Sequence, residues 1–152
     1  MILPLLFFLA AAPDHHCPPG FTPFEAAKKC YKVLDEKMDV VVATDACKRD
    51  NAVIVLPLNI EENNFITKLF KKSLESVDAP VDYRHIWLDV YYFGQWMGHE
   101  KKLTWFNWDK GMPETPRVTN MVVMNMDSGK WSNLEWLAGR DRKSVVCEVA
   151  MK

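Results

Sequence analysis

The residues of this chain with the most evident chemistry are its four cysteines. A thiolate can bind a metal or act as a nucleophile, whereas oxidised thiols pair as disulfides. The four are Cys17, Cys30, Cys47 and Cys147. An even count suits two disulfides in an oxidising compartment and leaves three connectivities open. His15 and His16 precede Cys17 and could suggest a metal site, but an oxidised Cys17 offers no thiolate and such a terminal pair is more often incidental.

Composition excludes several classes of function. The chain has 152 residues, which fits one domain, and a hydrophobic content of 49%, which argues against disorder. Its formal net charge of −1 gives no basic footprint for nucleic acid. No apolar run reaches the roughly 18–20 residues that a membrane span needs. No spacing of side chains indicates a catalytic acid and base or an activated nucleophile, so we expect no enzyme.

The apolar segment Met1–Ala12 indicates the compartment. It has no polar side chain and ends in small residues, as in a secretory signal peptide cut near Ala11-Ala12. The missing basic residue before the run and Pro13 after it are less typical, and the alternative is a buried N-terminal strand or helix. On the signal interpretation, residues 13–152 form a secreted, extracellular chain in which disulfides persist.

Local patterns predict two helices in the first half of the chain. Lys29–Leu34 alternates polar and apolar residues like a half-buried strand. Residues 39–51 combine strand propensity with i, i+3, i+4 spacing, and Asp39 as an N-cap favours a helix. Asn59 is expected to cap the second helix, with Glu62 three residues later as in a capping box. The apolar stripe predicted for that helix is Ile60, Phe65, Ile66, Leu69 and Phe70.

The second half has apolar runs of the length of strands. They are Ile86–Val90, Leu103–Trp108, Met121–Met126, Trp131 and Ser144–Val149. Trp96 falls in a predicted turn, where an exposed ring could anchor a partner or a sugar. Two early helices followed by a strand-rich half indicate an α+β fold.

Several short motifs in a fixed order give the chain a family resemblance. They are Cys17-Pro18-Pro19-Gly20-Phe21, Cys30-Tyr31, Ala43-x-x-x-Cys47, Glu61–Ile66, Trp87-Leu88-Asp89-Val90, Trp105–Trp108, Gly129–Asn133 and Val146-Cys147-Glu148. In this order and spacing, residues 17–150 resemble the C-type lectin-like domain. The resemblance implies a long-form domain over residues 13–152, with two helices, mixed and mostly antiparallel strands and a long loop. It also implies the disulfides Cys17–Cys30 and Cys47–Cys147.

The same resemblance places the ligand site in the long loop, where this chain departs from the family. A further family disulfide is replaced by Met121 and Trp136, which could pack as a sulfur–aromatic contact. The family's calcium motifs correspond here to Met112-Pro113-Glu114, Thr119 and Trp131-Ser132-Asn133. Calcium takes six to eight oxygens and favours carboxylates, of which Glu114 alone remains. We therefore expect no calcium at that position and no other cofactor or metal.

The resemblance implies a recognition module that binds an extracellular glycan or protein without calcium. The candidate ligand-binding residues are Trp108, Glu114, Asn120, Ser132 and Asn133, around the loop of residues 109–120. The depleted carboxylates favour a protein or other non-sugar ligand slightly over a sugar. A structural extracellular protein is the alternative, and an enzyme the remote one.

Overall fold

Both helices of the computed structural model begin at the polar residues that the sequence indicates. The structure describes residues 16–75, 84–116, 120–135 and 140–152. Helix α1 (Val40–Arg49) starts where the Asp39 side chain accepts a hydrogen bond from the Val42 amide, at 2.9 Å. Helix α2 (Ile60–Leu74) starts where Asn59 Oδ1 accepts from the Glu62 amide, also at 2.9 Å. Both predicted caps are confirmed.

The apolar stripe of α2 differs from the predicted one at its first residue. Ile66 and Phe70 are buried, and Phe65 and Leu69 pack beside them, but Ile60 is 49% exposed. At 3.6 residues per turn, Ile60 lies about 120° around the helix from Ile66 and therefore faces solvent. Including Ile60 in the stripe was wrong.

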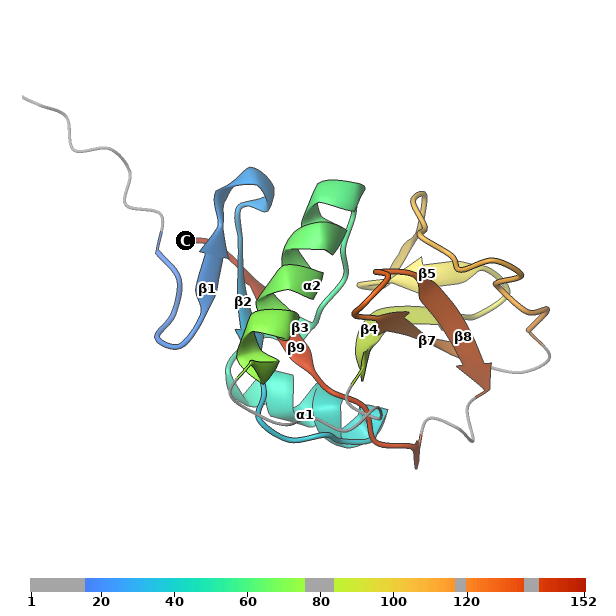
Figure 1. The fold of residues 1–152 in the computed structure, drawn as a ribbon, viewed down its shortest axis with the longest axis horizontal. Helices are drawn as coiled ribbons and strands as arrows, with labels where there is room; N and C mark the ends of the chain where they lie inside the picture. Colours follow the sequence, from blue (N-terminus) through green and yellow to red (C-terminus); the bar gives the residue numbers. More distant parts are fainter. Residues whose placement is uncertain (1–15, 76–83, 117–119, 136–139) are drawn as a thin grey trace, which may run out of the picture.

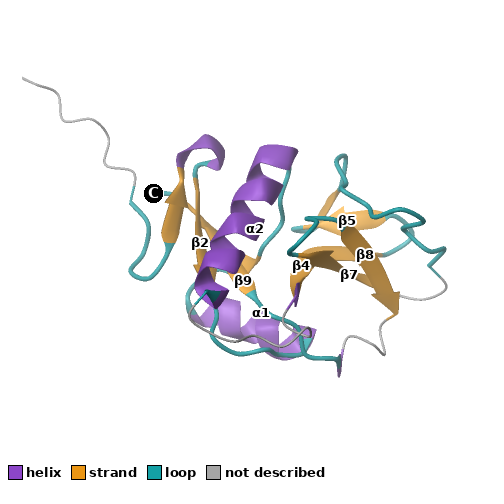
Figure 2. Ribbon diagram, in the orientation of Figure 1, coloured by secondary structure: helices purple, strands orange, loops and turns teal. Residues whose placement is uncertain are grey.

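The strands form two antiparallel sheets. In Figures 1 and 2 the second sheet lies to the right of α2, and the first sheet extends from behind the lower end of α2 to its left. The strand order is β1-β2-β9-β3 in the first sheet and β6-β5-β4-β7-β8 in the second. Their bounds are β1 (Thr22–Phe24), β2 (Lys29–Val33), β3 (Val53–Ile54), β4 (His85–Tyr92), β5 (Trp96–Gly98), β6 (Lys101–Lys102), β7 (Asn120–Asn125), β8 (Trp131–Glu135) and β9 (Val146–Ala150). The predicted α+β fold, two helices with mostly antiparallel strands, is confirmed. Within the described ranges, no helix is long and apolar enough to cross a membrane.

One predicted strand is absent. Residues 103–107 of the run Leu103–Trp108 lie outside any strand, and Trp108 forms only an isolated bridge to Trp131. Trp105 and Phe106 instead pack against the main hydrophobic core, which includes Tyr31, Ile66 and Trp131. A short apolar run alone does not separate a strand from a segment attached by its side chains.

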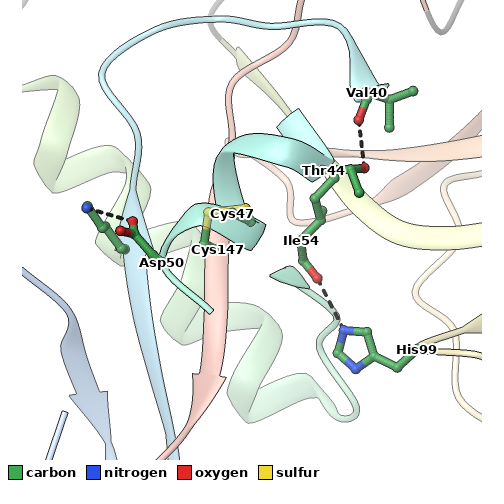
Figure 3. The surroundings of a disulfide bond; sticks show 8 residues. Val40, Thr44, Cys47, Asp50, Ile54, His99 and Cys147 are labelled. Atoms are coloured by element: carbon green, nitrogen blue, oxygen red, sulfur yellow. Dashed lines mark hydrogen bonds and ion pairs between the residues drawn. A yellow bond between two sulfur atoms is a disulfide. The ribbon is translucent and has the colours of Figure 1, made fainter. Parts of the chain in front are cut away.

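The two disulfides have the predicted pairing. Cys17 bonds Cys30 of β2, and Cys47 of α1 bonds Cys147 of β9, which is the pair at the centre of Figure 3. The second bond joins residues 100 positions apart. Strand β9 lies between β2 and β3, so the end of the chain is bonded on both sides to its first half.

A buried ionic cluster fixes α2 against the first sheet. The ammonium group of Lys29, on β2, lies 2.7 Å from Glu62 Oε1 and 2.9 Å from Glu148 Oε2. Tyr31 donates its hydroxyl hydrogen to Glu62 Oε1 at 2.6 Å. Glu62 and Glu148 are 1% and 4% exposed, so these contacts replace the water that both carboxylates lose on folding. We call Lys29, Tyr31, Glu62 and Glu148 the lysine cluster.

The lysine cluster gives Glu62 a role different from the predicted capping box. Glu62 Oε2 accepts from the amide of Leu58, one residue before the cap, and Oε1 is used by Tyr31 and Lys29. Burial lowers the pKa of Lys29, but Glu148 and Glu62 together raise it above its ordinary value. The ammonium group therefore stays charged between its two carboxylates.

Replacing Lys29 tests the cluster. Lys29→Met leaves Glu62 and Glu148 buried without their shared cation, so we expect a loss of about 3–5 kcal/mol in the free energy of unfolding, measured in urea at pH 7. Lys32→Met is the control from the same strand. Its partner Asp50 lies 2.9 Å away in a pair about one third exposed, where the loss should stay below about 1 kcal/mol.

The loss in Lys29→Met should also depend on pH. Burial raises the pKa of Glu148, and Lys29 is the first group that opposes this rise. Without Lys29 the folded-state pKa rises further above the unfolded value, so the carboxyl contributes stability at low pH that is lost as pH rises. The variant should be closer to the wild type at pH 5 than at pH 8. Equal losses at both pH values would contradict the role given to Lys29.

Candidate ligand-binding site

The start of β8 positions the described part of the long loop. The Trp131 amide donates to the Asn107 carbonyl, and the Asp109 amide donates to the Trp131 carbonyl, both at 2.9 Å. Residues 107–109 therefore run beside Trp131 as a short parallel bridge. The Met112 amide then donates to the Asp109 carbonyl, which turns the chain into the loop. The loop therefore leaves the sheet beside Trp131 and contacts β8 again at Asn133, two residues further along that strand.

Three predicted site residues meet at that return. Asn133 Oδ1 accepts from the Glu114 amide at 2.8 Å, and Asn133 Nδ2 donates to the Glu114 carbonyl at 3.0 Å. Asn133 Nδ2 also donates to Asn120 Oδ1 at 2.8 Å. We call Glu114, Asn120 and Asn133 the asparagine clasp. One side-chain amide binds both polar groups of the Glu114 main chain, so the clasp holds the loop as a strand partner would.

Sheet geometry explains the clasp. Asn133 is paired with Val122 and Asn120 with Glu135, so the two asparagines are diagonal neighbours on one face of the β7–β8 pair. They are 6% and 3% exposed. The main chain of Glu114 occupies the amide of Asn133, whereas the Glu114 side chain is exposed. In this arrangement the Glu114 carboxylate is open to solvent.

The structure places Ser132 away from the clasp. Side chains alternate along a strand, so Ser132 lies on the opposite face of β8 from Asn133. Its neighbour on that face, Leu134, packs against the core cluster beneath α1. Ser132 and Asn133 are adjacent in the sequence, but their side chains lie on opposite faces of β8.

Trp108 lies in an aromatic group beneath the loop. Its ring stacks on Phe106 with centroids 5.6 Å apart and meets Trp131 edge-on at 5.9 Å. Trp96 contacts Trp108 at 5.0 Å and Tyr92 at 5.2 Å. Trp96 is the first residue of β5 and is half-buried. The prediction of an exposed anchor in a turn was therefore wrong. Trp108 supports the loop through packing.

Sequence reasoning missed two further asparagines that support the site. Asn63 of α2 accepts at Oδ1 from the indole Nε1 of Trp131, at 2.9 Å, and donates from Nδ2 to the Gly129 carbonyl, at 3.0 Å. Asn107 Nδ2 donates to the same carbonyl at 2.7 Å. Asn63 is fully buried on the apolar face of its helix. A polar residue inside a predicted apolar face was the available signal, because a buried amide needs partners.

The groups at this position do not fit calcium. Met112 offers a thioether, which a hard cation does not favour. The oxygen of Asn133 already accepts from the Glu114 amide, and Asp109 Oδ1 accepts from the Lys110 amide. Over the described ranges, no three His, Cys, Asp or Glu side chains gather where they could hold a metal ion. Thr119 and Trp136 lie outside the described residues, so the expected Met121–Trp136 contact stays a prediction; Met121 itself is buried.

Removing the clasp tests its role. Asn133→Ala should leave the Glu114 amide without its side-chain acceptor and remove one hydrogen bond from Asn120 Oδ1, with a loss of about 1–3 kcal/mol in the free energy of unfolding. Hydrogen exchange should accelerate at the Glu114 amide more than elsewhere. The matched control is Ser132→Ala, the neighbour on the other face, which should change stability by at most about 0.5 kcal/mol. Unchanged exchange at Glu114 in Asn133→Ala would contradict the clasp.

Comparison with known proteins points to one fold. No protein-family model matches the chain. The human protein "C-type lectin domain family 3 member A" is 27% identical over 126 residues, which are 80% of this chain and 59% of that protein. The chain thus spans less than two thirds of that relative's length.

Solved structures agree with the sequence match. The cow C-type carbohydrate-recognition domain of CD23, solved in the presence of a GlcNAc2Man3 oligosaccharide, has a TM-score of 0.70 at 24% identity, covering 91% of this chain and 98% of that one. A calcium-independent type II antifreeze protein has a TM-score of 0.70 at 14% identity, covering 91% and 97%. Together with the two disulfides and the order of the strands, these likenesses show that the chain carries a domain of the C-type lectin-like fold.

Proposed function

We propose that the chain is a secreted recognition module that binds an extracellular ligand through the loop of residues 109–120 without calcium at that position. The fold is a recognition fold, and the site rather than the fold decides what is bound. The observation that carries the proposal is the asparagine clasp. A metal-dependent loop needs free side-chain oxygens, whereas here the Asn133 amide is bonded to the Glu114 main chain and to Asn120.

Two features favour a protein over a sugar as the ligand. Stacking on an exposed aromatic ring would favour a sugar, but the Trp108 ring contacts Phe106, Trp96 and Trp131. The group that the clasp exposes is one carboxylate, Glu114, which suits a basic side chain of a partner. The likeness to the CD23 domain keeps a glycan as the second candidate, and the likeness to the antifreeze protein supports calcium independence in this fold.

Secretion belongs to the same proposal. Two disulfides suit an oxidising compartment. The predicted signal peptide, Met1–Ala12, lies outside the described residues. Expression in a secreting cell with residues 1–12 present, followed by N-terminal sequencing of the protein in the medium, tests the expected cut near Ala11-Ala12. We propose no catalytic role, because the described site holds no nucleophile beside a base.

Ligand binding and metal dependence are tested together. The secreted protein is applied to a glycan array and to an array of extracellular proteins, each with calcium and with a chelator. We expect binding that the chelator leaves unchanged and that Glu114→Ala reduces at least about tenfold, since a charged contact is lost. The control is Glu36→Ala, an exposed carboxylate outside the loop. Binding that the chelator abolishes, or calorimetric calcium binding that Glu114→Ala removes, would overturn calcium independence.

A further inference from the structure

A second site lies between α1 and β4, on the other face of β7 from the asparagine clasp. Two adjoining cavities of about 280 and 380 Å³ share the residues Thr44, Ile54, Asp89 and Tyr91. The first also reaches Met121 on β7, next to Asn120 of the clasp but on the opposite face of the strand. Its volume is near the lower end of the roughly 300–1,000 Å³ of ligand pockets, so it suits a small molecule.

Asp89 lies on the cavity side of β4, beside an irregularity in the pairing of this strand. The pairing of β4 with β7 passes from Leu88–Val122 directly to Tyr91–Met121, so two residues of β4, Asp89 and Val90, face one step of β7. Leu88 and Val90 both pack in the main hydrophobic core, so Asp89 between them lies on the other face of β4, as the regular alternation of a strand predicts. Figure 3 shows Thr44 of α1 and Ile54, which both line the two cavities, and a dashed line from His99 to the Ile54 carbonyl. His99 Nε2 lies 3.2 Å from that carbonyl oxygen.

Only one oxygen of the Asp89 carboxylate, Oδ2, accepts a hydrogen bond from a described residue. Oδ2 accepts from the His99 amide at 3.2 Å and lies 3.4 Å from His99 Nε2. Oδ1 has no hydrogen-bond partner among the described residues, and no side-chain oxygen that is fully buried there lacks one. Oδ1 therefore reaches accessible space. Asp89 lines both cavities, and its side chain is 30% exposed.

The surroundings leave the charge of Asp89 partly uncompensated. Among the described residues that line the first cavity, Asp89 is the only charged one, and the walls are largely apolar, formed by Val40, Val41, Ile54, Leu88, Val90 and Met121. Burial raises the pKa of Asp89 and nearby Glu100 adds to the rise, while His99 lowers it. A cation at Oδ1 would stabilise the ionised form of the carboxylate. A hydrocarbon chain on the same ligand would be removed from water by packing against the valines.

We propose that this cavity binds a small organic cation with an apolar body, an alkylammonium or arylalkylammonium, whose ammonium group contacts Asp89 Oδ1. The aliphatic walls would take the hydrocarbon, and the Asp89 carboxylate on the same face of β4 would take the head group. The site uses none of the clasp residues, so it stands or falls independently of the proposed ligand binding at the loop.

The test titrates n-hexylammonium chloride into the ¹⁵N-labelled full chain and monitors the backbone amide signals by NMR. Hexan-1-ol and sodium hexanoate have the same chain length with a neutral and a negative head. We expect saturable shifts at the amides of Val41, Thr44 and Val90, with hexylammonium at least about tenfold tighter than hexanol and hexanoate weakest. Equal affinity for the three probes, or shifts that do not saturate at these amides, would overturn the proposal.

Two variants separate charge from space. Asp89→Asn keeps an oxygen for the His99 amide and removes the charge, so hexylammonium should weaken at least about tenfold while hexanol is unchanged. Val41→Trp places a ring at the mouth of the cavity and should abolish both. Its control is Val42→Trp, the next residue of α1, similarly exposed at 45% against 57% and not among the described lining.

The valine pair keeps the test decisive if Asp89→Asn does not fold. Val41→Trp and Val42→Trp change exposed positions of one helix, so both should fold as the wild type does. Equal binding of hexylammonium to the two variants would overturn the proposed location. Undiminished binding to a folded Asp89→Asn would overturn the proposed role of the carboxylate.

Discussion

The ammonium group of Lys29 is the contact on which the arrangement of the domain depends. It is the shared counter-ion of two buried carboxylates, one from α2 and one from β9, and so fixes the helix against the sheet that joins the two ends of the chain. Taking three charges out of water is costly, and only their close mutual contact offsets that cost. The cluster thus allows one position of α2 and penalises alternatives in which a carboxylate is left alone.

The position of α2 is passed on to the candidate site through the neighbouring residue. Asn63 follows Glu62 on the helix and bonds both the Trp131 indole and the Gly129 carbonyl. Gly129 has a positive φ of 70°, and an added Cβ there would lie 2.8 Å from the Asn63 amide nitrogen, so the approach of helix and turn requires glycine. Trp131 then begins β8, which carries Asn133. The lysine cluster therefore fixes α2, α2 fixes the start of β8 through Asn63, and β8 carries the asparagine that holds the loop.

Strand β7 separates two kinds of environment. Asn120 points to the clasp, where polar groups are bonded to one another, and Met121 points to the cavity of Asp89, where one carboxylate meets aliphatic walls. A half-buried strand would offer one of these faces to solvent, but here both are covered, and five of the six residues of β7 are buried. The two faces of the strand thus belong to two different environments that share no side chain.

The helix caps and the disulfide pairing were predicted correctly from the sequence. The caps at Asp39 and Asn59 involve residues three apart, and the motif order implied the disulfide pairing before any contact was known. The miss at Leu103–Trp108 and the roles of Glu62 and His99 depend on partners far along the chain. His99 contacts Ile54 and Asp89 and approaches Glu148, which lie 45, 10 and 49 positions away in the sequence. No sequence spacing encodes such contacts, because they exist only after the sheets have formed.

The bond between Cys47 and Cys147 closes a covalent ring that contains α2, the whole second sheet and the long loop. One peptide bond cut anywhere between these two cysteines would open the ring without dividing the molecule. Both pieces would remain a single covalent species until the disulfide is reduced. A protease that cuts the long loop would therefore leave the mass of the unreduced chain essentially unchanged, because the two pieces would stay joined through Cys47 of α1 and Cys147 of β9.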